Sequence, residues 1–161
     1  MIDVDIVSFT YPGRSKAALK DIRFRITPGE CVLIAGPTGC GKSTLLKCLN
    51  GIIPHASEGR LVGTVHVNGC DTQTVPLPRM AGRVGMVQQN PDDQIFSLMV
   101  EDEVGFGPEN LCLPVAEIDR RIDTALSQVG MQPFRKHRVK ALSGGQRQRI
   151  VIASILAMQP A

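Results

Sequence analysis

One glycine-rich segment carries the residue types that a phosphate-binding loop needs. Residues 36–44 read Gly36-Pro37-Thr38-Gly39-Cys40-Gly41-Lys42-Ser43-Thr44 and fit the pattern GxxxxGK[ST]. Glycines let the backbone curl so that successive N–H groups point at an anion, and the helix that follows adds its positive end. Lys42 can reach the β- and γ-phosphates of a nucleotide, and the Ser43 hydroxyl can ligate Mg²⁺. We predict an ATP and Mg²⁺ site here; a glycine-rich turn that binds nothing is the alternative.

A second segment has the residue types of another phosphate-binding helix N-terminus, which we call a helix start. It reads Leu142-Ser143-Gly144-Gly145-Gln146. Serine is a good N-cap, and the two glycines that follow leave backbone N–H groups uncovered at the positive end of a helix. A plain helix cap is the alternative. One bound nucleotide does not need both helix starts from the same subunit.

This second segment, followed by Arg147-Gln148-Arg149, resembles the signature motif of ABC-type ATPases. In that family, the resemblance implies, the signature of one subunit closes over the ATP held by the other. Two further residues match family positions. Gln89, in Val87-Gln88-Gln89-Asn90-Pro91, resembles the glutamine that reaches Mg²⁺ and positions the attacking water, although Gln88 stands where an aromatic is more usual. Tyr11 resembles the aromatic that stacks on adenine, a contact worth about 1–3 kcal/mol per base. A surface glutamine and a packing tyrosine are the alternatives.

Three segments narrow the resemblance to the ATPases of energy-coupling-factor transporters, which import vitamins and transition metals. They are residues 50–55, 90–96 and 100–110. The resemblance implies three partners: a second ABC ATPase subunit in a homo- or heterodimer, a transmembrane coupling subunit and a substrate-binding membrane component. It places the protein peripherally on the cytoplasmic face of the membrane. The apolar residues beside Gln89 predict docking on the transmembrane partner through residues 89–106.

Composition is that of a soluble globular protein, with 43% apolar and 20% charged residues among 161. The net charge of +3 does not call for nucleic acid as a partner. No window approaches the roughly 18–20 apolar residues of a membrane-spanning helix. The basic run at residues 135–140 is interpreted as a solvated loop. All five cysteines are expected as free thiols, with Cys31 and Cys48 buried.

The elements that must position these residues follow from hydrophobic periodicity. Alternation predicts strands at 2–11, 22–26 and 61–68, and apolar runs predict buried strands at 31–35 and 84–88. Helices are predicted at 42–50, 114–130 and 143–158. The expected fold is α/β, a P-loop NTPase with a RecA-like parallel core, an antiparallel β part and a helical insertion. We divide the chain into an α/β core (1–90), a helical subdomain (91–143) and the signature helix (144–161).

No Asp or Glu follows Asp123. The resemblance implies a later strand that carries an aspartate for the Mg²⁺ shell and a glutamate as general base. We therefore expect an incomplete domain with no general base, and no meaningful ATP turnover by these 161 residues alone. Two other hypotheses stay open: a non-transport ABC ATPase acting on DNA or the ribosome, and a catalytically inactive remnant that binds nucleotide.

Overall fold

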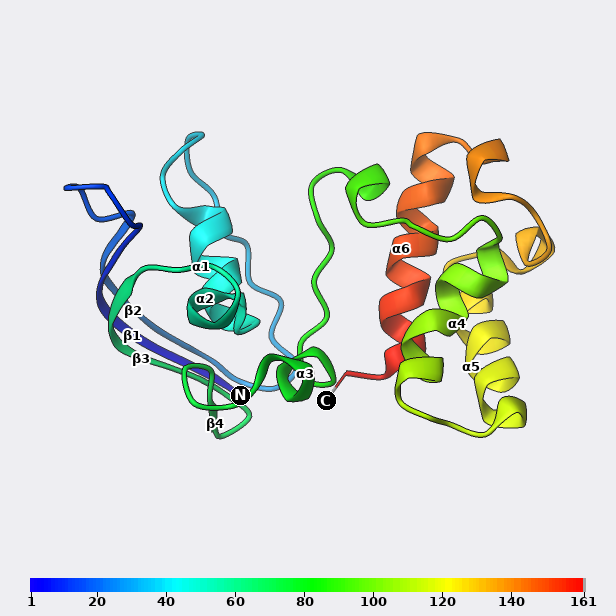
Figure 1. Ribbon diagram of the computed structural model, residues 1–161, viewed down its shortest axis with the longest axis horizontal. Helices are drawn as coiled ribbons and strands as arrows, with labels where there is room; N and C mark the ends of the chain where they lie inside the picture. Colours follow the sequence, from blue (N-terminus) through cyan, green and yellow to red (C-terminus); the bar gives the residue numbers. More distant parts are fainter. Residues whose placement is uncertain (161) are drawn as a thin grey trace. The chain divides into compact units, whose positions relative to one another are not determined.

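The computed structural model describes residues 1–160, which form two compact units, residues 1–84 and 85–160. The first unit contains all the strands found in the described chain, and the second is helical (Figure 1). The division lies a few residues before the expected boundary at 90/91, and the signature helix packs within the helical unit. No helix in residues 1–160 combines the length and the apolar character needed to cross a membrane.

A four-stranded antiparallel sheet of order β2-β1-β3-β4 forms the base of the first unit. Its strands are β1 (Ile2–Thr10), β2 (Leu19–Ile26), β3 (Arg60–Val67) and β4 (Cys70–Asp71). In the centre of β1, Val4 lies opposite Phe24 of β2 and Val65 of β3. An irregularity between Ile6 and Ser8 shifts the alternation, so the inward side chains of β1 are Val4, Ile6 and Phe9. The strands predicted at 2–11, 22–26 and 61–68 are confirmed.

Helices of the first unit are α1 (Lys42–Leu49), α2 (Ile52–His55) and α3 (Leu77–Ala81). The apolar face of α1 packs on the inner face of the sheet through Leu45, Cys48 and Leu49. The helix ends at Leu49 with Asn50 as its C-cap, and Gly51 at φ 79° provides a left-handed turn after it. Burial of Cys48 raises the pKa of its thiol to about 11.

Two predicted strands are wrong for the described chain. Residues 31–35 and 84–88 are extended but belong to no sheet. Leu33 is 89% exposed, Val32 is 51% exposed, and Cys31 is exposed rather than buried. An apolar run becomes a fully buried strand only when other strands flank it on both sides, and within residues 1–160 none pairs with either segment. The parallel core is therefore not formed by these residues.

The second unit packs three main helices, α4 (Val100–Asn110), α5 (Val115–Gln128) and α6 (Gly144–Met158), with short 3₁₀ helices η1 (Pro91–Asp93), η2 (Gln132–Phe134) and η3 (Val139–Ala141). Its core is aliphatic, and its members are Val100, Val104, Ile122, Ala125, Leu126, Met131, Val139, Leu142, Ile150, Ala153 and Ala157. Both predicted helices, 114–130 and 143–158, are confirmed. On α5, Ile122 and Leu126 are buried, whereas Val115 at the first position is 76% exposed.

Candidate nucleotide-binding site

The loop before α1 has the backbone that a phosphate-binding loop requires. Gly39 and Gly41 have φ angles of 82° and 98°, in the left-handed region that favours glycine. A Cβ on Gly41 would lie 2.6 Å from the Ala18 carbonyl oxygen, so the loop packs directly on the chain entering β2. No side chain caps α1. The N–H groups in the first turn of any α-helix have no intrahelical acceptor. Because no side-chain cap accepts from them here, they remain available to an anion.

Lys42 is the first residue of α1 and folds over its own loop. Its Nζ donates to the carbonyl oxygens of Gly36 at 2.7 Å and Pro37 at 2.9 Å, and lies 3.7 Å from the Cys40 sulfur. The ammonium group thus sits inside the curl of the loop, held by neutral acceptors. A phosphate is a stronger partner for it than a carbonyl, because both members of the pair are then charged.

A cavity of about 430 Å³ adjoins this loop, lined by Tyr11, Arg14, Lys16, Ala17, Ala18, Gly39 and Cys40. The Tyr11 hydroxyl shares a hydrogen bond with Thr44 Oγ1 of α1 at 3.1 Å. The Tyr11 ring packs edge-on against the Phe9 ring, with 4.8 Å between the ring centroids. Tyr11 is therefore fixed against α1 while it lines the cavity. Arg14 and Lys16 were not singled out from the sequence. The sequence could have indicated them, because these two cations follow Tyr11 within a few residues and a polyanion needs positive charge near its phosphates.

The residues present fit a nucleotide and its metal. The loop supplies open backbone, Lys42 supplies charge, and nothing lies within 4 Å of the place where a Cβ on Gly39 would stand. Ser43 is exposed at the first turn of α1, and its hydroxyl is the candidate ligand for Mg²⁺. Mg²⁺ in such sites takes its other ligands from phosphate oxygens and water. The described residues hold no group of three or more His, Cys, Asp or Glu that could bind a metal by themselves.

The second predicted phosphate-binding helix start is built differently. Ser143 caps α6 with a full capping box: Gln146 N–H donates to Ser143 Oγ at 3.3 Å, and Ser143 N–H donates to Gln146 Oε1 at 2.8 Å. Gly144 and Gly145 follow with open space around both, so no side chain blocks the approach to the helix start. Leu142 is buried in the core and anchors the segment.

Gln89 belongs to the second unit, as the signature does, and is exposed. The extended segment before it is held by Gln94, whose side chain accepts from Gln88 N–H at 3.0 Å and donates to the Met86 carbonyl at 3.0 Å. Asn90 then caps η1 by accepting from Asp92 N–H at 3.3 Å. Gln94 therefore supplies, with one side chain, the contacts that a neighbouring strand would make. Sequence reasoning noted this residue only as part of a family-like segment.

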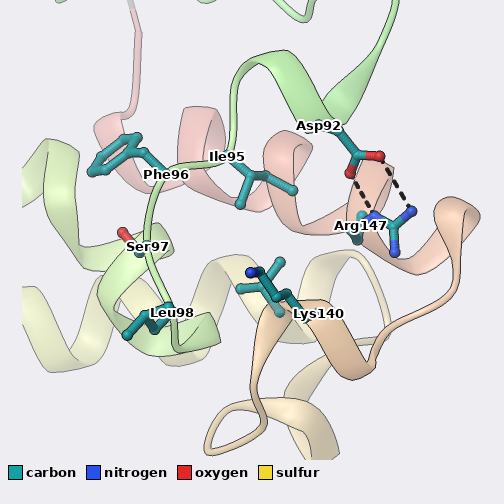
Figure 2. A pocket seen from close by; sticks show the side chains of 8 residues that line it. Asp92, Ile95, Phe96, Ser97, Leu98, Lys140 and Arg147 are labelled. Atoms are coloured by element: carbon teal, nitrogen blue, oxygen red, sulfur yellow. Dashed lines mark hydrogen bonds and ion pairs between the residues drawn. The ribbon is translucent and has the colours of Figure 1, made fainter.

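A cavity of about 620 Å³ lies beside η1 in the second unit (Figure 2). We call it the groove; it is lined by Asp92, Ile95, Phe96, Ser97, Leu98, Val139, Lys140 and Arg147. Phe96 and Leu98 are 61% and 71% exposed. Phe96 packs edge-on against the half-exposed Phe106, with 4.4 Å between the ring centroids. Val100, which we expected in the docking surface, is instead fully buried in the core.

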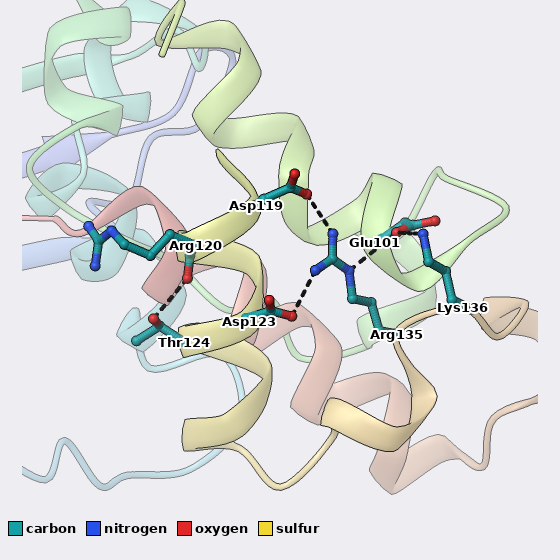
Figure 3. A network of polar contacts seen from close by, with 7 residues as sticks. All are labelled: Glu101, Asp119, Arg120, Asp123, Thr124, Arg135 and Lys136. Atoms are coloured by element: carbon teal, nitrogen blue, oxygen red, sulfur yellow. Dashed lines mark hydrogen bonds and ion pairs between the residues drawn. The ribbon is translucent and has the colours of Figure 1, made fainter. Parts of the chain in front are cut away.

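The basic run before the signature is not a simple solvated loop. Arg135 donates to Asp119 at 2.6 Å, to Asp123 at 2.7 Å and to Glu101 at 3.3 Å, joining α4 and α5 (Figure 3). A hydrogen bond from Lys136 and further charge from Arg135 lower the pKa of Glu101. Backbone bonds run alongside: Val139 N–H donates to the Leu98 carbonyl at 2.9 Å. The approach to the signature is therefore held to α4 and α5 by charge, and to the groove wall by a backbone hydrogen bond.

The comparisons with known proteins agree with this geometry. The pattern of the ABC transporter family matches residues 19–161. The chain is 56% identical over 160 residues to a protein of Methanosarcina acetivorans described as an ABC transporter ATP-binding protein. The aligned region covers 99% of this chain and 25% of that protein. The chain is 39% identical to YkoD of Bacillus subtilis, described as an HMP/thiamine import ATP-binding protein, over 99% of this chain and 29% of that one. It thus spans about a quarter of the length of these relatives.

Two solved structures share the fold. Clostridium perfringens cbiO1, described as part of the ABC transporter complex cbiONQ, superposes with a TM-score of 0.85 at 32% identity, over 99% of this chain and 62% of that one. The ATP-binding cassette MJ0796, in a dimer bound to ADP and Pi, superposes with a TM-score of 0.81 at 27% identity, over 99% and 71%. The P-loop NTPase fold class is thereby confirmed. Since the family pattern covers most of the sequence, the chain belongs to the ABC transporter family.

Proposed function

We propose that this chain is the ATP-binding part of an energy-coupling-factor importer, which binds and hydrolyses ATP to drive uptake of a vitamin or a metal ion. One observation carries the proposal: the chain presents two helix starts suited to phosphate, an uncapped one at Lys42 and a glycine-flanked one at Ser143. The two lie in separate units of the chain. In a pair of ATPase subunits, each bound ATP would contact the loop at Lys42 of one subunit and the signature at Ser143 of the other, so both helix starts are used.

In this proposal residues 36–44 bind the triphosphate, and Tyr11 stacks on the adenine. Ser43 and Gln89 complete the shell of Mg²⁺ with phosphate oxygens and water, and Gln89 positions the attacking water. Mg²⁺, when bound, neutralises the charge that develops on the phosphates. Residues 142–146 contact the ATP of the second ATPase unit. Arg14 and Lys16 add positive charge at the mouth of the site, where they attract a polyanion.

The groove is our proposed docking site for a transmembrane coupling subunit. Exposed Phe96 and Leu98 give it an apolar rim, Phe106 packs against Phe96 beside it, and Lys140 and Asp92 give it charge. Exposed apolar side chains gathered around a cavity are typical of protein interaction sites. The likeness to cbiO1 and to YkoD supports an importer. The proposal places the protein on the cytoplasmic face of the membrane, beside a substrate-binding membrane component and without nucleic acid.

The test is purification of the full-length protein from native membranes under mild detergent. The proposal expects membrane subunits to co-purify with wild-type protein and to be lost when Phe96→Asp puts a charge on the groove rim. Val115→Asp is the matched control, because Val115 is also a largely exposed apolar residue of the same unit and lies outside the groove. Retention of the membrane subunits by Phe96→Asp, or a stable complex with nucleic acid instead, would refute the proposal.

A further inference from the structure

One side chain, Arg147 of α6, ties the start of the signature helix to the groove. Its Nη1 donates to the Leu142 carbonyl at 2.6 Å, one residue before the Ser143 cap. On its other side Nη2 donates to Asp92 Oδ2 at 3.3 Å, and Nε lies 2.6 Å from Oδ1 (Figure 2). The Nε–H is not aimed at an acceptor within the described chain, so that contact is charge attraction at ion-pair distance.

Partial burial makes the Arg147–Asp92 ion pair stronger than a fully exposed surface pair. The Arg147 side chain is 26% exposed and the Asp92 side chain 55% exposed. Partly sheltered charges are screened less by water and salt than fully exposed ones. The planar guanidinium presents several donors in fixed directions, so that it can satisfy a carbonyl and a carboxylate together, which a lysine ammonium cannot do with the same geometry.

The capping box and Arg147 constrain different things. Ser143 and Gln146 bond to each other's backbone, so the box fixes the first turn of α6 internally. It does not fix where that turn lies relative to the rest of the unit. Buried Leu142 helps to do so, and Arg147 adds a contact to η1, a separate segment just beyond Gln89 that contains Asp92.

We propose that Arg147 is a positioning residue for the signature: the Asp92–Arg147–Leu142 clamp holds Ser143, Gly144 and Gly145 where they meet the ATP of the second ATPase unit. This rests on the proposed function, in which the signature acts in trans. Both charged members of the clamp also line the groove. A partner that fills the groove therefore touches the clamp directly. A displacement of about 1 Å at a site that positions reacting groups can cost about 100-fold.

The experiment separates nucleotide binding from closure in the full-length protein. A fluorescent, non-hydrolysable ATP analogue reports initial binding by its affinity, and closure by a slow phase in its release. Arg147→Met is expected to leave initial affinity within twofold and to accelerate the slow release at least tenfold. Asp92→Asn is expected to shift it in the same direction. The double variant is expected to be no faster than Arg147→Met alone, because both changes break one contact.

Arg120→Met is the matched control. Arg120 forms an ion pair with Glu117 at 2.7 Å on α5, in the same unit and away from the groove. Its loss is expected to leave the slow phase unchanged. Arg147→Lys keeps the charge and is expected to restore only part of the slow phase, an outcome that a merely bulky or merely charged role would not produce.

Unchanged slow release in Arg147→Met would overturn the clamp and leave the proposed function standing. If Arg147→Met fails to fold, Asp92→Asn decides, since Asp92 is a half-exposed carboxylate, and an unchanged slow phase there overturns the clamp as well. A wild-type protein that binds the analogue with no slow phase would instead refute action in trans, and the clamp with it.

Discussion

The two predicted phosphate-binding helix starts differ in how they satisfy their own backbone. α1 begins after Gly41 with no side-chain cap, and its lysine rests on loop carbonyls. α6 begins after Ser143 with a complete capping box. Both have glycines beside them, yet one leaves its N–H groups for a ligand and the other has already used side chains on part of its first turn.

This difference suggests a division of labour. A start without a cap gains much from an anion, because the anion supplies acceptors that the protein lacks. A capped start is stable without a ligand and gains less, so it suits a contact that forms and breaks in each cycle. We infer that α1 holds the nucleotide continuously and that α6 engages only on closure. The predictions below change one start at a time.

The largest effect is expected from Lys42→Ala, which removes the only side-chain cation of the loop. Charged hydrogen bonds to phosphate are among the strongest in proteins, so binding of a fluorescent ATP analogue should weaken at least about 100-fold. Lys47→Ala, in the last turn of the same helix, is the control and should bind normally. Binding by Lys42→Ala within threefold of wild type would show that the loop assignment is wrong.

Gly41→Ala and Gly145→Ala compare the two starts by steric room. A Cβ at Gly41 meets the Ala18 carbonyl oxygen at 2.6 Å and must adopt φ 98°, whereas a Cβ at Gly145 meets nothing within 4 Å. Gly41→Ala should lower the free energy of unfolding of the first unit by about 2 kcal/mol. Gly145→Ala should leave the stability of its unit unchanged. Urea denaturation measures both, and equal losses would contradict the difference in packing.

Ser143→Asp separates capping from phosphate contact. Aspartate caps as well as serine and favours a helix start, so the thermal stability of the second unit should be kept. Its negative charge would repel the γ-phosphate of the ATP held by the partner ATPase subunit. Trapping of nucleotide should therefore weaken about tenfold while initial binding stays intact. Ser143→Asn, a neutral cap, is the control; normal trapping by Ser143→Asp would exclude close approach of phosphate to this helix start.

Sequence reasoning succeeded where the signal was local. The two helix starts, the three strands that pair antiparallel and the caps at Gly51 and Ser143 follow from residue type and spacing. It failed at residues 31–35 and 84–88, because a strand depends on neighbours that an apolar run does not specify. It also missed the Asp92–Arg147 pair and the Arg135 cluster, since contacts between distant charges arise only when the helices pack.

Tyr11→Phe should weaken nucleotide binding far less than Lys42→Ala does. The variant keeps the ring that lines the cavity and loses the hydrogen bond shared between the Tyr11 hydroxyl and Thr44 Oγ1. One such bond contributes about 0.5–1.5 kcal/mol, so nucleotide affinity should fall no more than about tenfold. Tyr11→Ala should lose in addition the stacking energy of about 1–3 kcal/mol. Equal affinities of the Phe and Ala variants would mean that the ring does not meet the base.

The smallest effect is expected from acid that protonates one carboxylate, Glu117, in the unit of the capped start. Hydrogen bonds from Arg120 and Arg121 lower the pKa of Glu117 from 4.5 to about 2. A carboxylate whose pKa is lower in the folded state contributes stability above its unfolded pKa and loses it as pH falls through the folded one. The contribution of Glu117 is therefore complete above about pH 4.5 and disappears toward pH 2. Arg121 also donates to the Ala157 carbonyl at 3.2 Å, so this loss should loosen α5 against α6.

Amide hydrogen exchange between pH 5 and pH 2, corrected for the intrinsic pH dependence of exchange, measures that loosening helix by helix. Protection in α5 and α6 should decrease as pH falls, and the decrease should be small because these ion pairs lie at the surface. Glu117→Gln removes the titrating group, so its protection should already be reduced at pH 5 and should change less with pH. Glu109→Gln, which removes a carboxylate with no ion pair in residues 1–160, should behave like wild type. An identical pH response in Glu117→Gln and wild type would show that the ion pairs of Glu117 do not help to hold α6 against α5.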